Sequence, residues 1–311
     1  MSTTTASSSS PIQTVAISGA SGMVGSALTS VLQTEGKSVL AMSRKEGGSY
    51  QDSIRWDPAS GLTNPSRLES VDAVVHLAGE NIAAGRWNSK LKAKIRNSRI
   101  EGTRNLVKSI AAVEKRPKVL VCASAIGFYG DRGAAELDES SAAGEGFLAD
   151  VCRDWEVEAN AATELGVRVV NVRIGVVLSP DGGALAKMLL PFKLGVGGVI
   201  GSGKQYWSWI GLNDLVRVIT FCINNESVAG PVNAVSPNSL TNKEFTKIVG
   251  GVLHRPTIFP LPAFMAKLVL GEMAEALLLS SSRVLPKKLQ KAGFTFAQPE
   301  LAECLQYELK K

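Results

Sequence analysis

The sequence predicts an α/β fold: a doubly wound parallel sheet with a small, mainly helical C-terminal part. Apolar runs of strand length alternate with helix-like stretches up to about residue 236, and a glycine-rich turn joins the first strand to the first helix. Beyond residue 237, proline-broken helical segments replace this alternation. Strands that alternate with helices pair in parallel, and the helices cover both faces of the sheet. With 311 residues, 45% of them hydrophobic, the chain can bury a full core.

The elements begin at Thr14, and a strand–turn–helix–strand unit of about 30 residues opens the chain. The strand Thr14–Ser18 leads through Gly19–Gly25 into a helix over residues 26–32, and the strand Ser38–Met42 follows. Later apolar runs predict three more strands, Ala73–Leu77, Val119–Ala123 and Val167–Val172. Periodic segments between these runs predict two helices, Ser89–Val113 and Leu148–Leu165. Three C-terminal helices are expected over Asn242–Leu253, Ala263–Leu279 and Pro299–Leu309.

The net charge of +6 conceals two oppositely charged segments. Residues 86–118 carry eleven Lys or Arg and two Glu, hence +9, whereas residues 131–164 carry ten acids and two Arg, hence −8. Without zinc-ligand spacing, an RNA-binding aromatic signature or a basic zipper, this pattern does not indicate a nucleic-acid partner. We expect solvated helix faces, with some of the cations meeting an anionic cofactor.

Cysteine and histidine usage argues against a metal site and a disulfide framework. The four Cys lie far apart without a CxxC pair, and the chain has only two His. We expect a reducing compartment, the cytoplasm or an organelle. No window reaches the roughly 18 apolar residues of a membrane span, so we expect no membrane partner. The uncharged Ser/Thr-rich segment 1–12 is expected to be a disordered tail rather than a secretory signal.

The glycine turn predicts a dinucleotide site. Gly19, Gly22 and Gly25 have GxxGxxG spacing between a strand and a helix. Such glycines permit a tight turn, close approach of a pyrophosphate and close helix packing, while the helix N-terminus attracts the anion. We expect cofactor contacts from Gly19, Gly22, Gly25 and the intervening residues Ser21, Met23 and Val24.

The end of the second strand favours NADP over NAD. An acid there would bind the ribose 2′-hydroxyl of NAD, but the chain carries Ser43, Arg44 and Lys45. A guanidinium makes charge-assisted, bidentate contacts to a phosphate, and the lysine adds a point charge. The alternative is that Arg44 and Lys45 are ordinary loop cations.

Several further motifs resemble those of the extended short-chain dehydrogenase/reductases, in particular an atypical "epimerase family" branch with a C-terminal domain of unknown function. The resemblance covers nearly all of residues 14–307. It implies a Rossmann-type domain with strand order 3-2-1-4-5-6-7 that binds NADP(H), here residues 13–236, and a substrate-pocket domain at 237–311. The motifs are Gly19–Gly25, Leu77–Ile82, Arg86-Trp87, Ser98-Arg99, Ser124–Gly130, Trp155-Glu156, Arg173–Pro180, Gly201–Gly203 and Trp209-Ile210.

The resemblance implies additional cofactor contacts. Leu77, Ala78 and Gly79 match a loop of small residues that lies along the ribose and the nicotinamide linker. Arg99 stands three residues before Gly102-Thr103, where it could reach a phosphate. Val177 matches a loop that abuts the nicotinamide, although strand-end packing also explains Leu77, Ala78 and Val177.

The usual proton-transfer pair of this superfamily is missing. Its members use a Ser, a Tyr and a Lys four residues after the Tyr; the Lys lowers the pKa of the Tyr, which transfers the proton. Ser124 matches the Ser, but Leu148 and Cys152 occupy the Tyr and Lys positions. We expect Ser124 to act at the carboxyl edge of the sheet, with a strand-capping role as the alternative. Tyr129 is a weaker candidate acid, since it matches a Tyr that usually only packs nearby.

Two functions remain open from the sequence. The first is an NADP(H)-dependent oxidoreductase or epimerase-like enzyme for an unknown small molecule, which would use Ser124 with Tyr129 or a water. The second is an NADP(H)-binding sensor or scaffold without turnover. A homodimer is possible in either case.

Overall fold

The computed structural model describes residues 11–44 and 53–310. Residues 1–10 of the tail expected to be disordered and Lys45, expected to contact the cofactor, lie outside the described residues.

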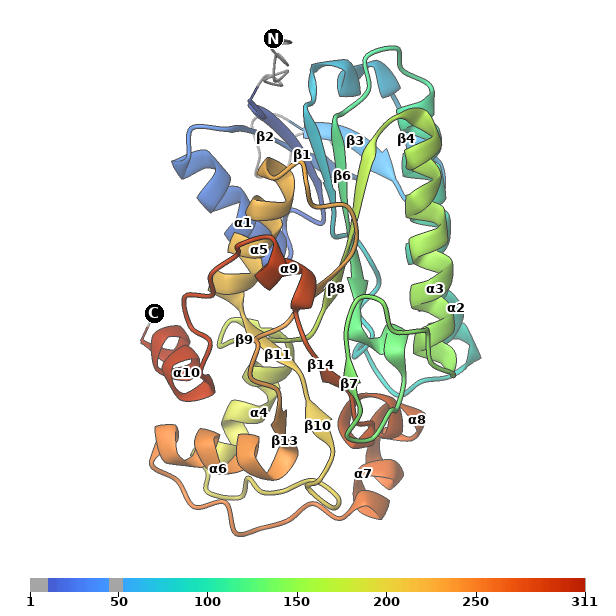
Figure 1. Cartoon of the computed structure of the whole chain (residues 1–311). Helices are drawn as coiled ribbons and strands as arrows, with labels where there is room; N and C mark the ends of the chain where they lie inside the picture. The colour runs from blue at the N-terminus through green and yellow to red at the C-terminus, as the bar shows by residue number, and fades with distance from the viewer. Residues whose placement is uncertain (1–10, 45–52, 311) are drawn as a thin grey trace.

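An eight-stranded sheet forms the centre of the molecule, in the order β12-β8-β6-β5-β1-β2-β3-β4 (Figure 1). Every pair is parallel except β3 with β4. Numbered along the chain, the seven parallel strands have the order 3-2-1-4-5-6-7, which confirms the predicted doubly wound sheet. The strands are β1 Thr14–Ser18, β2 Ser38–Ser43, β3 Ser53–Asp57, β4 Gly61–Leu62, β5 Ala73–His76, β6 Val119–Ala125, β8 Arg168–Ile174 and β12 Gly230–Ala234.

Helices cover both faces of the sheet (Figure 1). Val15 and Ile17 of β1 belong to a core that includes side chains of α1 (Met23–Thr34) and α5 (Leu212–Asn224). Ala16 points to the opposite core, which includes side chains of α2 (Ser89–Ala111) and α3 (Phe147–Asn160). Because both faces are buried, the strands read as continuous apolar runs.

A third core lies below the carboxyl edge of the sheet and defines a smaller lobe. Residues 176–209 and 240–305 contribute to it, so the lobe contains residues from before and after the domain boundary that we expected at residue 237. That boundary stays a prediction. The pairs β9–β11 and β10–β13 belong to this lobe, and β7–β14 ties it to the sheet domain. Its elements are β9 Val176–Ser179, α4 Gly183–Lys193, β10 Tyr206–Trp207, β11 Trp209–Gly211, β13 Leu240–Thr241, α6 Asn242–Leu253 and α10 Leu301–Leu309, with β7 Glu136–Leu137, β14 Arg283–Val284 and α9 Lys287–Lys291 at the junction.

The single helix expected over Ala263–Leu279 is divided. It forms α7 (Ala263–Leu270), α8 (Glu272–Ala274) and a π-helical turn, Glu275–Leu279. Gly271 between them has φ +62°, a left-handed conformation that ends a helix and that glycine adopts without steric cost.

Candidate cofactor and active site

The glycine turn lies where the strand order reverses, between β1 and β5. Gly19 has φ +72°, and a Cβ there would lie 3.0 Å from the Ala78 nitrogen. A Cβ on Gly25 would lie 2.8 Å from the Ala20 Cα, so α1 can pack this closely only with glycine. No side chain caps α1, and its first turn contains no acid. The first N–H groups of the helix are therefore available to an anion.

A cavity of about 380 Å³ opens at this turn. It brings together eight of the fourteen residues predicted to bind the cofactor, whereas Ser21, Ala78, Val177, Ser43 and Arg44 do not line it. Glu80, Asn81 and Ile82, which were not among those fourteen, complete the wall. The predicted residues in the lining are Gly19, Gly22, Met23, Val24, Gly25, Leu77, Gly79 and Arg99.

Arg99 reaches this cavity from α2. Its guanidinium donates to the carbonyl oxygens of Glu80 and Ile95, at 3.0 and 3.1 Å, and lies beside Gly79, where a Cβ would be 3.2 Å from Cζ. It also lies over the Trp155 ring at 5.2 Å. Burial lowers the pKa of Arg99, so its charge is held in a poorly solvated place. A half-buried cation that lines the same cavity as a helix N-terminus suits an anionic ligand.

Buried polar contacts support the wall of the cavity. His76, at the end of β5, lies 2.6 Å through Nδ1 from the Ser18 hydroxyl, which accepts the Ala78 amide at 3.3 Å. Burial, with Arg99 adding to the effect, lowers the pKa of His76 to about 4. His76 is therefore neutral at pH 7. It holds the loop after β5 through Ser18 and carries no charge that would attract an anion.

The predicted 2′-phosphate contacts lie at the end of β2. Ser43 is its last residue, and the exposed Arg44 follows directly. In the β2–β3 pairing, Ser43 stands opposite Arg55, which is also exposed. Arg55 is a second cation at this strand end that the sequence reading missed. Only the β2–β3 register reveals it, since ten residues lie between Arg44 and Arg55 in the sequence.

Ser124 belongs to a buried polar network. Its hydroxyl donates to Glu156 Oε1 at 2.7 Å, and Arg173 holds the same carboxylate through Nε and Nη2, both at 2.8 Å. Arg173 stands opposite Ser124 in the β6–β8 register, and Glu156 reaches them from α3. Although burial opposes its charge, the hydrogen bond to Glu156 raises the pKa of Arg173. In the sequence, Glu156 and Arg173 belong to motifs that resemble those of the family, and we predicted no role for either residue.

Tyr129 lies at the other end of this network. Its side chain is fully buried, and its hydroxyl donates to Asn233 Oδ1 at 2.7 Å while accepting from Arg173 Nη1 at 2.9 Å. Burial raises the pKa of Tyr129 to about 12. These contacts give Tyr129 a structural role at the junction of the sheet and the smaller lobe, and its part in proton transfer stays a prediction.

The positions that carry Tyr and Lys in related enzymes face the same region. Leu148, Cys152 and Glu156 repeat at four-residue intervals along α3, which places them on one side of the helix. A Cβ on Gly127 would lie 3.2 Å from the Leu148 Cβ and 3.9 Å from the Cys152 sulfur. Burial raises the pKa of Cys152 to about 11, so its thiol stays protonated at neutral pH.

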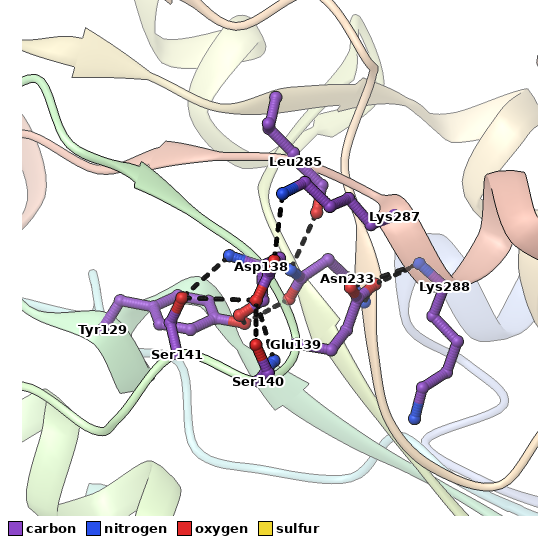
Figure 2. A network of polar contacts seen from close by, with 9 residues as sticks. All are labelled: Tyr129, Asp138, Glu139, Ser140, Ser141, Asn233, Leu285, Lys287 and Lys288. Atoms are coloured by element: carbon purple, nitrogen blue, oxygen red, sulfur yellow. Dashed lines mark hydrogen bonds and ion pairs between the residues drawn. The ribbon is translucent and has the colours of Figure 1, made fainter.

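Figure 2 shows how the network continues from Tyr129 to α9. Glu139 accepts the backbone amides of Asn233 and Lys288, and Lys287 Nζ pairs with Asp138 at 3.1 Å. A second hollow, of about 320 Å³, lies against Asp138, Glu139 and the lysines of α9. Since these carboxylates are engaged by backbone amides and Lys287, we assign the cluster to holding α9 on the sheet domain.

Comparison with known proteins supports a cofactor site at the glycine turn. Residues 15–234 match the NAD dependent epimerase/dehydratase family, and residues 261–308 match a domain of unknown function, DUF1731. The chain is 43% identical over 293 residues to the "Epimerase family protein MT2273" of Mycobacterium tuberculosis, covering 94% of this chain and 96% of the relative. It is 38% identical over 299 residues to a chloroplastic SDR39U1 homolog of Arabidopsis thaliana, covering 94% and 85%.

A solved structure shares the whole architecture. The crystal structure of human epimerase family protein SDR39U1 with NADPH aligns with a TM-score of 0.87 and 37% identity, covering 96% of this chain and all of that one. The sheet order, the glycine turn and the match to both halves of the chain agree with the resemblance drawn from the motifs. The chain belongs to the NAD dependent epimerase/dehydratase family, within the extended short-chain dehydrogenase/reductases, and carries a DUF1731 domain at its C-terminus.

Proposed function

We propose that this protein binds NADP(H) in the cavity at the glycine turn and uses it as an oxidoreductase or epimerase-like enzyme on a small molecule. One observation carries the proposal: the uncapped first turn of α1 and the half-buried Arg99 line the same 380 Å³ cavity. Backbone N–H groups and a cation in one cavity fit the pyrophosphate of a dinucleotide. The NADPH in the related human structure supports this choice of ligand.

The preference for NADP rests on the carboxyl end of β2. Arg44, and Arg55 opposite Ser43 on β3, would meet the 2′-phosphate, with Lys45 as a third cation. Positions 43–45 contain no Asp or Glu that could bind the ribose 2′-hydroxyl of NAD. NADPH is therefore expected to bind more tightly than NADH.

Bound NADP(H) supplies or accepts the hydride, and the residues of this chain supply proton handling and orientation. The Ser124 proton is committed to Glu156, so the Ser124 oxygen presents lone pairs with which it can accept a hydrogen bond from a substrate hydroxyl. Arg173 fixes Glu156 through two hydrogen bonds and thereby fixes Ser124. We place the substrate at the carboxyl edge of the sheet, against the smaller lobe.

A non-catalytic NADP(H) sensor or scaffold is the second candidate. The observation in its favour is that the Tyr129 hydroxyl is engaged by Asn233 and Arg173. The motif resemblance also matches Leu148 and Cys152 to the Tyr and Lys positions, and neither can replace that pair. A location in the cytoplasm or in an organelle, and a homodimer, are further expectations; among relatives, the Arabidopsis protein is named chloroplastic.

Fluorescence titration with NADPH and NADH tests the cofactor proposal. Removal of a hydrogen-bonded charge costs about 1.5–3 kcal/mol, or roughly 10- to 100-fold in Kd. Arg44→Ala should weaken NADPH by that factor and leave NADH unchanged, since only NADPH carries the 2′-phosphate. The matched control is Arg67→Ala, an exposed Arg in the 3₁₀ turn that precedes β5 at the other edge of the sheet. Equal affinity of the wild type for both nucleotides would contradict the proposal.

NADPH oxidation across a panel of carbonyl compounds separates the two candidates. An enzyme should oxidise NADPH with at least one compound, and Ser124→Ala should lower kcat. If turnover is present but unchanged in Ser124→Ala, Ser124 has no part in the mechanism. Tight NADPH binding without turnover on the whole panel favours the sensor or scaffold.

A further inference from the structure

Exposed apolar side chains concentrate at one end of the molecule. Among the described residues, twelve large hydrophobic side chains are exposed, and nine of them come from two segments, 190–196 and 258–269. The other three, Val31, Val157 and Tyr307, lie on separate helices. We call the nine the apolar end face: Leu190, Leu194, Val196, Ile258, Phe259, Phe264, Met265, Leu268 and Val269.

Backbone contacts join the two segments into one surface. Gly198 pairs with Ile258, Ile200 pairs with Leu261, and Arg255 Nε donates to the Lys193 carbonyl at 2.9 Å. Helix α7 begins two residues after Leu261. In Figure 1, the segment between α6 and α7 and helix α7 lie at the lower end of the molecule, and α4 lies just above α6.

Helix α7 turns its apolar side outward. Phe264 and Leu268 are one helical turn apart, as are Met265 and Val269, and the four are 44–73% exposed. Ala266, on the opposite side, is 1% exposed. An exposed apolar side of this kind marks a surface that another molecule covers when the protein functions.

The charge around the apolar end face is mainly positive, although Asp181, Glu244, Glu272 and Glu275 flank its two segments. Residues 182–204 and 245–271 contain six Lys or Arg and no Asp or Glu. Two of the six lie within the face, Lys193 beside Leu194 and Lys267 in α7, and both are exposed. The acids that follow the second segment are already engaged, Glu272 with Lys92 and Glu275 with Lys267.

Self-association does not suit this charge pattern. A twofold dimer sets the same patch of two copies against each other, so the cations of one copy, Lys193 and Arg255 among them, would face the cations of the other. One of the flanking acids, Glu275, is already paired with Lys267. An anionic lipid surface offers what the face requires, since its acyl region accepts Phe and Leu side chains while its phosphates meet the surrounding cations.

We propose that the apolar end face docks on a membrane surface that contains anionic lipids, so that the protein is a peripheral membrane protein. None of the helices in residues 11–44 and 53–310 has the length and apolar character to cross a membrane, so the contact is one of surface attachment. This proposal departs from our expectation of no membrane partner, which rested only on the lack of a spanning segment. It does not depend on the proposed function.

Vesicle flotation with the full chain tests the proposal, using phosphatidylcholine vesicles with and without phosphatidylglycerol. We expect binding only when phosphatidylglycerol is present. Phe264→Ser with Leu268→Ser should weaken this binding more than tenfold, whereas the control Val157→Ser, also an exposed apolar residue, should bind as the wild type does. Circular dichroism and NADPH affinity show that each variant is folded.

The cations are tested separately. Each Lys near an anionic surface contributes about 1 kcal/mol, or roughly fivefold in affinity. Lys193→Gln should therefore weaken binding about fivefold, while the control Lys108→Gln, near the C-terminal end of α2, should change it little. Failure to float with anionic vesicles would overturn the proposal. A dimer in sedimentation velocity that Phe264→Ser with Leu268→Ser dissociates would also overturn it, because the face would then belong to a second copy.

Discussion

Replacing Glu156 by alanine tests whether the network behind Ser124 is as buried as its contacts indicate. The carboxylate accepts one hydrogen bond from Ser124 and two from Arg173, all between 2.7 and 2.8 Å. Arg173 is only 3% exposed, so Glu156→Ala leaves its charge with the Tyr129 hydroxyl and the Phe128 ring as partners. Removing one member of a buried ion pair costs about 3–5 kcal/mol. We therefore expect urea denaturation to show a free energy of unfolding lower by about 4 kcal/mol.

Two further variants make this result specific. Glu156→Ala combined with Arg173→Met removes both charges, so the double variant should be more stable than Glu156→Ala alone. Asp154→Ala, two residues before Glu156 in α3, breaks an exposed pair with Arg96 of α2, and it should cost less than about 1 kcal/mol. A loss below about 1 kcal/mol for Glu156→Ala, or a double variant less stable than the single one, would refute the reasoning.

Three more predictions concern other buried groups. Because the pKa of His76 is about 4 in the folded protein and 6.5 in the unfolded chain, stability should fall by about 3 kcal/mol as pH drops from 6.5 to 4. Urea unfolding at each pH should show this loss in the wild type and not in His76→Gln, and parallel profiles would contradict it. Gly25→Ala places a Cβ 2.8 Å from the Ala20 Cα and should lower stability by about 1–3 kcal/mol and NADPH affinity at least tenfold, measured by denaturation and titration. Gly251→Ala, whose Cβ meets nothing within 4 Å, is its control, and equal effects would oppose the reasoning. Since burial raises the pKa of Cys152 to about 11 and of Cys222 to about 12, native protein at pH 8 should react with a thiol reagent only slowly, and fast labelling of either Cys would count against their burial.

Local pattern was enough to predict the first half of the site. The strand Thr14–Ser18 has the expected bounds, and the glycines of the turn line one cavity, because strand, turn and helix lie next to one another in the sequence. Arg99 lines the same cavity from α2, and it was expected there from the resemblance to the family rather than from local pattern. The short strands β3 and β12 were not predicted. The sequence of β12 begins with Gly230 and Pro231, which are unfavourable in strands, so no strand was expected there. Its pairing with β8 defines it as a strand.

Tertiary pairing decides the rest of the site. The partners of Ser124 are Glu156, 32 residues away on α3, and Arg173 on the neighbouring strand. No local period marks such a group. The apolar end face was equally hidden, because the sequence does not distinguish an exposed apolar helix side from a buried one, and Phe264, Met265 and Leu268 are exposed in the structure.

The central claim is that the glycine turn and Arg99 together hold a dinucleotide, and calorimetric titration of Arg99→Met with NADPH tests it most directly. The variant keeps the packing of the side chain and removes its charge, so Kd should rise roughly 10- to 100-fold. Arg96→Met, an exposed position in the same helix, should bind NADPH as the wild type does. An Arg99→Met protein that is folded and binds NADPH with unchanged affinity would contradict the account.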